Sequence, residues 1–166
     1  MAFTETARET NFKLTDRGQF EAELAAQIDH ASRNGATGAM LMIDVGRRFD
    51  DAEVADLGDA LCSCLHDGDL LTVTGRGEFA ALVHNADRHE AIAIADALLG
   101  EIHRHVGSRT GGWRSSASIG LALESDVSPL VPTQLHNAAD AAMSDAQSSG
   151  HDRLAIYDSR RHDDCN

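Results

Sequence analysis

Residues 70–83 read LLTVTGRGEFAALV, and this stretch decides which fold the sequence predicts. Two apolar runs rich in Val, Leu, Thr and Ala flank a short Gly-Arg-Gly step at residues 75–77. Strand-favouring runs joined by glycines are typical of a β-hairpin, because glycine readily adopts the positive φ of tight turns. The turn is expected to carry Arg76 and Glu78 into solvent at one end of a sheet.

Apolar periodicity on both sides of the hairpin predicts helices that alternate with strands. Residues 39–45 (AMLMIDV) form a continuous apolar run that is typical of a central strand buried on both faces, and Asp44 lies near its end. A glycine-rich loop is expected at residues 107–113. The expected helices are 16–34, 51–65, 86–106 and 133–149, and the expected strands are 39–45, 115–123, 154–157 and the two arms of the hairpin.

This order of elements predicts an α/β (α+β) sandwich in which helices flank a five-stranded mixed sheet with a central β-hairpin. A ferredoxin-like βαββαβ unit fits residues 39–123. A chain of 166 residues is long enough for a single domain with a substantial core. Residues 14–158 are expected to form that domain, between a flexible N-terminal lead at 1–13 and a flexible charged tail at 159–166.

Composition excludes several classes of function. A net charge of −13 argues against nucleic-acid binding, which needs a basic face, and against binding to anionic membranes. The sequence has no apolar run of transmembrane length and no signal-peptide core, so the cytoplasm is the expected location. The Cys62-x-Cys64 spacing suits neither a disulfide nor a usual zinc site, and free thiols are expected there.

The hairpin and five further stretches together resemble the GGDEF family of diguanylate cyclases, and the resemblance spans residues 14–158. In the hairpin the family signature Gly-Gly-Asp/Glu-Glu-Phe stands as Gly75, Arg76, Gly77, Glu78 and Phe79. The resemblance implies the palm topology that nucleotide cyclases share. The other matching stretches are residues 14–20 (LTDRGQF), 42–44 (MID), 117–120 (ASIG), 138–143 (AADAAM) and 149–153 (SGHDR).

The resemblance implies a chemistry whose metal site is altered in this sequence. In the active family, two GTP molecules are joined while two magnesium ions, held by carboxylates, stabilise the charge that develops on the phosphate. One ligand comes from the position of Asp44 and another from the third signature residue, which is Gly77 here and has no side-chain oxygen. Asp44 and Glu78 then remain as a remnant pair that would hold a single hydrated ion weakly, or as two solvent-facing carboxylates without a metal.

Other positions that face the nucleotide in the family also depart from its pattern. Arg76 replaces the second signature glycine, which keeps the backbone open to the substrate. The loop that follows Asp44 is about ten residues shorter than the family's guanine-binding loop, judged from where the helical periodicity resumes. The family's two phosphate-contacting cations align with Gln147 and His151. Because phosphoryl transfer depends on positioning and charge, these losses together predict an inactive domain.

The family's allosteric product site, an Arg-x-x-Asp motif before the hairpin, is also altered. The same spacing reads HDGD at residues 66–69, so Asp69 matches and His66 replaces the arginine. Without the arginine's bidentate contacts, cyclic di-GMP binding there is not expected, and Asp69 is interpreted as an ordinary turn residue.

Three hypotheses follow. The first is a catalytically inactive, degenerate GGDEF domain that serves as a regulatory or protein–protein interaction module in bacterial signalling, with a protein partner or self-association and no expected cofactor. The second is a sensor that binds GTP or cyclic di-GMP without turnover, although the shortened loop and Arg76 argue against nucleotide binding. The third is a weakly active cyclase in which Asp44 and Glu78 hold magnesium.

Overall fold

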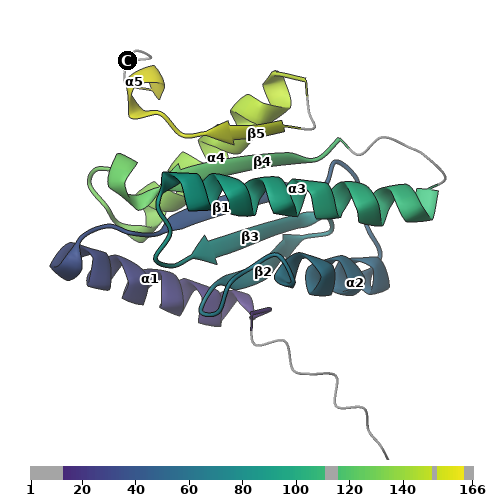
Figure 1. Ribbon diagram of the computed structural model, residues 1–166, viewed down its shortest axis with the longest axis horizontal. Helices are drawn as coiled ribbons and strands as arrows, with labels where there is room; N and C mark the ends of the chain where they lie inside the picture. Colours follow the sequence, from purple (N-terminus) through teal and green to yellow (C-terminus); the bar gives the residue numbers. More distant parts are fainter. Residues whose placement is uncertain (1–12, 111–115, 151–152, 163–166) are drawn as a thin grey trace, which may run out of the picture.

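The computed structural model describes residues 13–110, 116–150 and 153–162, which form an α/β sandwich (Figure 1). The expected hairpin is confirmed as strands β2 and β3, and the expected order of helices and strands is confirmed along the described chain. The elements are α1 (Arg17–Asn34), β1 (Ala39–Asp44), α2 (Asp51–Cys62), β2 (Leu70–Gly75), β3 (Glu78–Val83), α3 (Arg88–Thr110), β4 (Ser118–Leu123), η1 (Glu124–Asp126), α4 (Pro132–Ser148), β5 (Arg153–Ile156) and α5 (Ser159–His162).

The five strands form one mixed sheet in the order β2-β3-β1-β4-β5. β1 pairs antiparallel with both β3 and β4, whereas β4 pairs parallel with β5. The carboxyl end of β1 therefore lies beside the start of β3, and Asp44 is the register partner of Glu78. This register places the hairpin turn and the end of β1 at the same end of the sheet.

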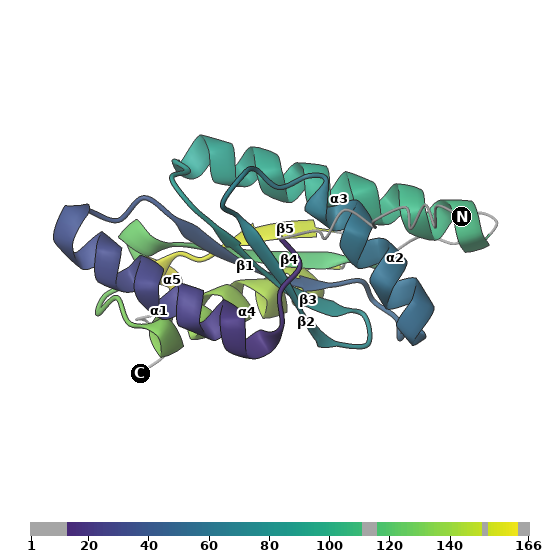
Figure 2. The ribbon, with the colours of Figure 1, turned by 90° about the horizontal axis from the view of Figure 1, so that it is seen from below.

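Helices cover both faces of the sheet, with α2 and α3 on one face and α1 and α4 on the other (Figures 1 and 2). Alternate residues of β1 point to the two faces. Leu41 and Ile43 join the core beneath α2 and α3, while Met40 and Met42 join the core beneath α1 and α4. Burial on both faces explains why this strand has a continuous apolar sequence.

Local capping sets where the helices begin. Asp16 caps α1 by accepting a hydrogen bond from the amide of Gln19 at 2.8 Å. Asp50 and Glu53 form a capping box at α2, in which each side chain accepts from the other residue's backbone amide. This box fixes where α2 starts, and therefore how short the loop between β1 and α2 must be.

The structure corrects several boundaries and refines the ends of the chain. α2 ends at Cys62 and not at residue 65, and β4 begins at Ser118. The expected glycine-rich loop is wrong at its start, because α3 continues through Gly107 to Thr110, and residues 111–115 lie outside the described part. Residues 1–12 of the lead that was expected to be flexible lie outside the described part of the chain. Its last residue, Lys13, is described, and its Nζ donates to the carbonyl of Leu65 at 2.7 Å. In the expected tail, residues 159–162 form α5 and residues 163–166 are not described. No helix within the described ranges is long and apolar enough to cross a membrane.

Candidate functional site

The hairpin turn between β2 and β3 consists of Arg76 and Gly77. The Gly77 amide donates to the carbonyl of Gly75 at 2.9 Å, which closes the turn, and Gly77 has φ +115°. Arg76 and Glu78 are exposed, as the sequence predicts, whereas the side chain of Phe79 is 0% exposed and belongs to the core. The turn thus presents one cation and one carboxylate to solvent.

The loop that follows β1 packs directly against this turn. The amide of Val45 donates to the carbonyl of Gly77 at 2.9 Å, and the amide of Phe49 donates to the carbonyl of Arg76 at 3.2 Å. The side chain of Phe49 is buried and anchors the loop in the core. The guanidinium of Arg47 lies 4.5 Å from the ring centre of Phe49. These contacts hold the loop after β1 against the hairpin turn.

Gly77 has no room for a side chain. A Cβ at this position would overlap the carbonyl oxygen of Arg47 and would lie 3.0 Å from Cγ2 of Val45. Both the positive φ and this close approach require glycine. An acidic side chain therefore does not fit at residue 77 in this conformation of the loop and the turn.

Asp44 and Glu78 are register partners, but their carboxylates are held differently. Asp44 accepts hydrogen bonds at 2.8 Å from the Gly46 amide and from Nε2 of Gln147. Glu78 leans toward β2, since its Oε2 would lie 2.8 Å from a Cβ on Gly75. β3 lies between β2 and β1, so the Glu78 carboxylate leans away from Asp44. Within the described chain, no three His, Cys, Asp or Glu side chains are grouped closely enough to hold a metal ion.

His66 and Asp69 lie at the turn that leads into β2, away from the hairpin tip. Asp69 is 1% exposed, and its carboxylate accepts from the amide of His66 at 2.8 Å and from the amide of His84 at 3.0 Å. Both carboxylate oxygens are thus used by the backbone. His66 is exposed and contributes its amide to this arrangement. The geometry agrees with the interpretation of Asp69 as a turn residue.

Sequence reasoning missed two features of this region. It did not predict the contact between Gln147 and Asp44, which joins residues 103 apart in the chain. It also did not predict that the Arg47 carbonyl fills the space beside Gly77. The short loop was visible in the sequence, but the position of its backbone depends on tertiary packing. His151 lies outside the described residues.

Comparisons with known proteins bear on this geometry in two ways. The family profile described as "Diguanylate cyclase, GGDEF domain" matches residues 11–153. The chain therefore belongs to the GGDEF diguanylate cyclase domain family, a family of cyclic di-GMP signalling. Among proteins with curated descriptions, none matches this sequence.

Solved structures share the fold at low sequence identity. The isolated GGDEF domain of TpbB (YfiN) from Pseudomonas aeruginosa has a TM-score of 0.73 and 23% identity, over 90% of this chain and 93% of that chain. The active GGEEF domain of a diguanylate cyclase from Vibrio cholerae has a TM-score of 0.68 and 18% identity, over 86% and 96%. Diguanylate cyclase SiaD from Pseudomonas aeruginosa, solved with its activator SiaC, has a TM-score of 0.68 and 23% identity, over 91% of this chain and 62% of that chain.

Proposed function

We propose that this GGDEF domain does not synthesise cyclic di-GMP and acts as a regulatory or protein–protein interaction module in the bacterial cytoplasm. The observation that carries the proposal is the packing at Gly77, where the Arg47 carbonyl leaves no space for a side chain. Catalysis in the family requires a carboxylate at this signature position to bind metal. This domain has neither that carboxylate nor room for it.

The other residues do not compensate for the missing ligand. Asp44 is already hydrogen bonded to the Gly46 amide and to Gln147, a neutral side chain at a position where the family has a cation. Glu78 leans toward Gly75 on the far side of β3. A hard cation such as Mg²⁺ needs several oxygen ligands at nearly ideal octahedral positions. The residues present therefore do not fit the family's magnesium site, and no catalytic step is assigned to it.

Two structural relatives support this assignment. The Vibrio cholerae domain, which is described as active, has the signature GGEEF, whereas the same positions read GRGEF here. SiaD forms a complex with a protein activator, which is a precedent for protein partners within the family. We propose that this domain binds a protein partner or a second copy of itself.

The activity test combines a product assay with thermal unfolding. The domain is incubated with millimolar GTP and Mg²⁺, and cyclic di-GMP is measured by mass spectrometry beside the Vibrio cholerae domain as a positive control. Thermal unfolding is followed with GTP and Mg²⁺, with cyclic di-GMP, and with neither. A ligand at about 100 times its dissociation constant stabilises by roughly 2.7 kcal/mol, so binding would raise the melting temperature measurably.

The proposal predicts no product and no shift in melting temperature. A shift without product would instead identify a nucleotide sensor. Product that disappears in the Asp44→Ala variant would identify a weakly active cyclase in which Asp44 and Glu78 hold magnesium. Sedimentation over a range of protein concentrations tests self-association, and a monomer throughout would leave a different protein as the partner.

A further inference from the structure

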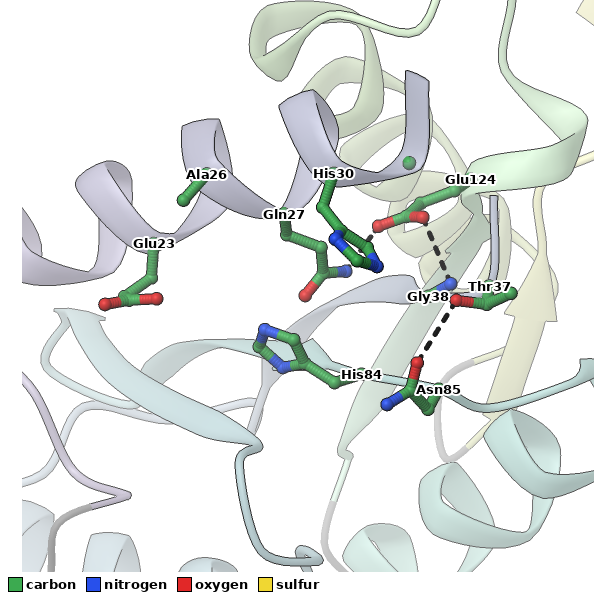
Figure 3. A pocket seen from close by; sticks show the side chains of 10 residues that line it. Glu23, Ala26, Gln27, His30, Thr37, Gly38, His84, Asn85 and Glu124 are labelled. Atoms are coloured by element: carbon green, nitrogen blue, oxygen red, sulfur yellow. Dashed lines mark hydrogen bonds between the residues drawn. The ribbon is translucent and has the colours of Figure 1, made fainter. Parts of the chain in front are cut away.

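A polar cavity lies beside the start of β1, at the opposite end of the sheet from the hairpin turn. Figure 3 shows the residues that line it. It has a volume of about 190 Å³ and lies between α1 and the segments that adjoin β1, β3 and β4. It shares one residue with the sites described above, because the amide of His84 donates to Asp69. The residues that line it include Glu23, Gln27, His30, Gly38, His84 and Glu124.

A carboxylate is buried in the wall of this cavity. Glu124 is 2% exposed, and its Oε1 accepts from Nε2 of Gln27 while its Oε2 accepts from the Gly38 amide at 3.1 Å. Neither donor carries a charge, and among the residues that the structure describes no lysine or arginine lines the cavity. Burying a carboxylate is costly unless hydrogen bonds or an opposite charge compensate for the lost hydration. The Glu124 carboxylate is therefore held in the wall by two neutral donors.

The amide of Gln27 leaves an acceptor without a partner. Gln27 is 8% exposed, and its Nε2 donates both to Glu124 and to the carbonyl of Val83 at 3.2 Å. Rotating the amide would place Oε1 against two acceptors, so the orientation is fixed by these neighbours. Oε1 is consequently buried without a hydrogen-bond partner, as is Nδ1 of His84. Figure 3 shows the Gln27 amide and the His84 ring facing the same space.

Gly38 makes this arrangement sterically feasible. A Cβ on Gly38 would overlap Nε2 of Gln27 and would lie 2.6 Å from Oε1 of Glu124 and 2.7 Å from the carbonyl oxygen of Val83. Only a glycine allows the three groups to approach this closely. The buried carboxylate of Glu124 and the amide of Gln27 therefore meet beside Gly38 in the wall of the cavity. The carboxylate of Glu23 also lines the cavity, but it is exposed.

We propose that this cavity binds an organic cation with N–H donors, namely an ammonium or guanidinium group. Glu124 and Glu23 supply negative charge, and Oε1 of Gln27 supplies an acceptor that an N–H group would satisfy. The volume suffices, because a cavity of roughly 150 Å³ accommodates a molecule as large as benzene. A metal ion fits less well, since the described residues contain no group of three potential ligands.

The cation has two chemical sources, which are a free small amine or guanidine and the side chain of a lysine or arginine on another protein. Both share the group that the cavity recognises. This inference does not depend on the proposed loss of cyclase activity, because the cavity and the hairpin turn lie at opposite ends of the sheet.

Binding is tested on the full chain by NMR titration. Methylguanidinium and methylammonium are added at pH 8, where an unperturbed imidazole is neutral, with tetramethylammonium at equal ionic strength as a control that has charge but no N–H donor. We expect saturable shifts of the Gly38 amide and the Gln27 side-chain amide with at least one of the two donors. Shifts that do not saturate, or that tetramethylammonium reproduces, would overturn the proposal.

Matched variants locate the bound cation. Glu124→Gln removes the buried charge and is expected to weaken binding about tenfold or more, because it removes one partner of a charged hydrogen bond. Glu23→Gln keeps the buried hydrogen bonds intact and is expected to weaken binding about threefold, so the test survives if Glu124→Gln does not fold. Glu21 lies on the same helix, pairs with Arg17 and does not line this cavity. The Glu21→Gln variant should therefore leave the affinity for the cation unchanged.

A final titration separates the two sources. Agmatine represents a free guanidine, and an arginine amide capped at both ends represents a protein side chain. Saturable binding of agmatine alone would assign a small-molecule ligand, and binding of the capped arginine as well would assign a partner's side chain. Equal affinity of Glu23→Gln, Glu124→Gln and the unmodified chain for every probe would show that the cations bind elsewhere and would refute the site.

Discussion

The carbonyl oxygen of Arg47 occupies the space into which a side chain on Gly77 would project. Two hydrogen bonds, from the amides of Val45 and Phe49 to the carbonyls of the turn, hold the loop in that position. The guanidinium of Arg47 also pairs with Glu53 at 3.3 Å. The shortened loop and the glycine in the signature are therefore linked departures from the family pattern. The loop takes this position only because residue 77 has no side chain.

Replacing Gly77 should destabilise the domain. The change Gly77→Ala places a Cβ against the Arg47 carbonyl and forces an L residue to φ +115°. We expect the free energy of unfolding to fall by about 1–3 kcal/mol, measured by urea denaturation. Gly100→Ala is the control, because Gly100 is exposed in α3 with nothing within 4 Å of its Cβ position, and it should stabilise by about 0.8–1 kcal/mol.

The same packing predicts that Gly77→Asp will not restore cyclase activity. The aspartate can project only if the loop moves, which breaks the hydrogen bonds made by Val45 and Phe49. The expected result is a less stable domain without product when cyclic di-GMP is measured by mass spectrometry. A stable variant that makes product would contradict our description of the loop as fixed.

Asp69 should matter for stability rather than for ligand binding. Asp69→Ala leaves the amides of His66 and His84 without their acceptors, and each loss costs about 1–3 kcal/mol. We expect a total loss of about 2–6 kcal/mol in chemical denaturation, with a smaller loss for Asp69→Asn. The neighbouring Asp67 is exposed, so Asp67→Ala should change the free energy of unfolding by less than about 0.5 kcal/mol. Equal effects at the two positions would refute the structural role of Asp69.

Gly120 should be needed for the packing of α4 on β4. A Cβ there would overlap the backbone of Ala139 and Met143 and would lie 2.7 Å from the Met143 Cα. Gly120→Ala must push the helix away from the sheet, so we expect a loss of about 1–3 kcal/mol in urea denaturation. Gly107→Ala in α3 meets no atom within 4 Å and serves as the control.

Cys64 should react slowly with alkylating reagents. Burial raises the pKa of the Cys64 thiol above its ordinary value of 9.0, and the nearby carboxylate of Glu101 raises it further. The folded chain therefore releases this proton at a higher pH than the unfolded chain. The contribution of this thiol to the free energy of unfolding is constant below pH 9.0, and it falls as the pH rises from there through the folded pKa. Peptide mapping after iodoacetamide treatment should show slower modification in the folded than in the denatured chain at pH 9.

The order of helices and strands along the chain was predictable because its determinants are local or periodic. The GRG step marks the hairpin, and the apolar run of β1 marks a strand covered on both faces. The end of α3 was not predictable in the same way. Glycine usually breaks helices, yet Gly107 lies within a helix whose neighbouring turn buries Ile102 and Val106 in the core, and this packing outweighs the intrinsic preference.

The candidate site was predictable in its residues and not in its contacts. The resemblance singled out Asp44 and Glu78 together, and the two residues are register partners in β1 and β3. The direction in which Glu78 leans and the hydrogen bond from Gln147 to Asp44 depend on side-chain and helix positions that no sequence pattern encodes. The buried group formed by Gln27, Gly38 and Glu124 was missed for the same reason, because its members are far apart in the chain.

The carboxylate of Asp69 accepts hydrogen bonds from the backbone amides of His66 and His84. Asp69 joins two backbone segments, so this aspartate supports the fold whether or not a nucleotide binds beside it. Its presence in a sequence is therefore not diagnostic of feedback inhibition.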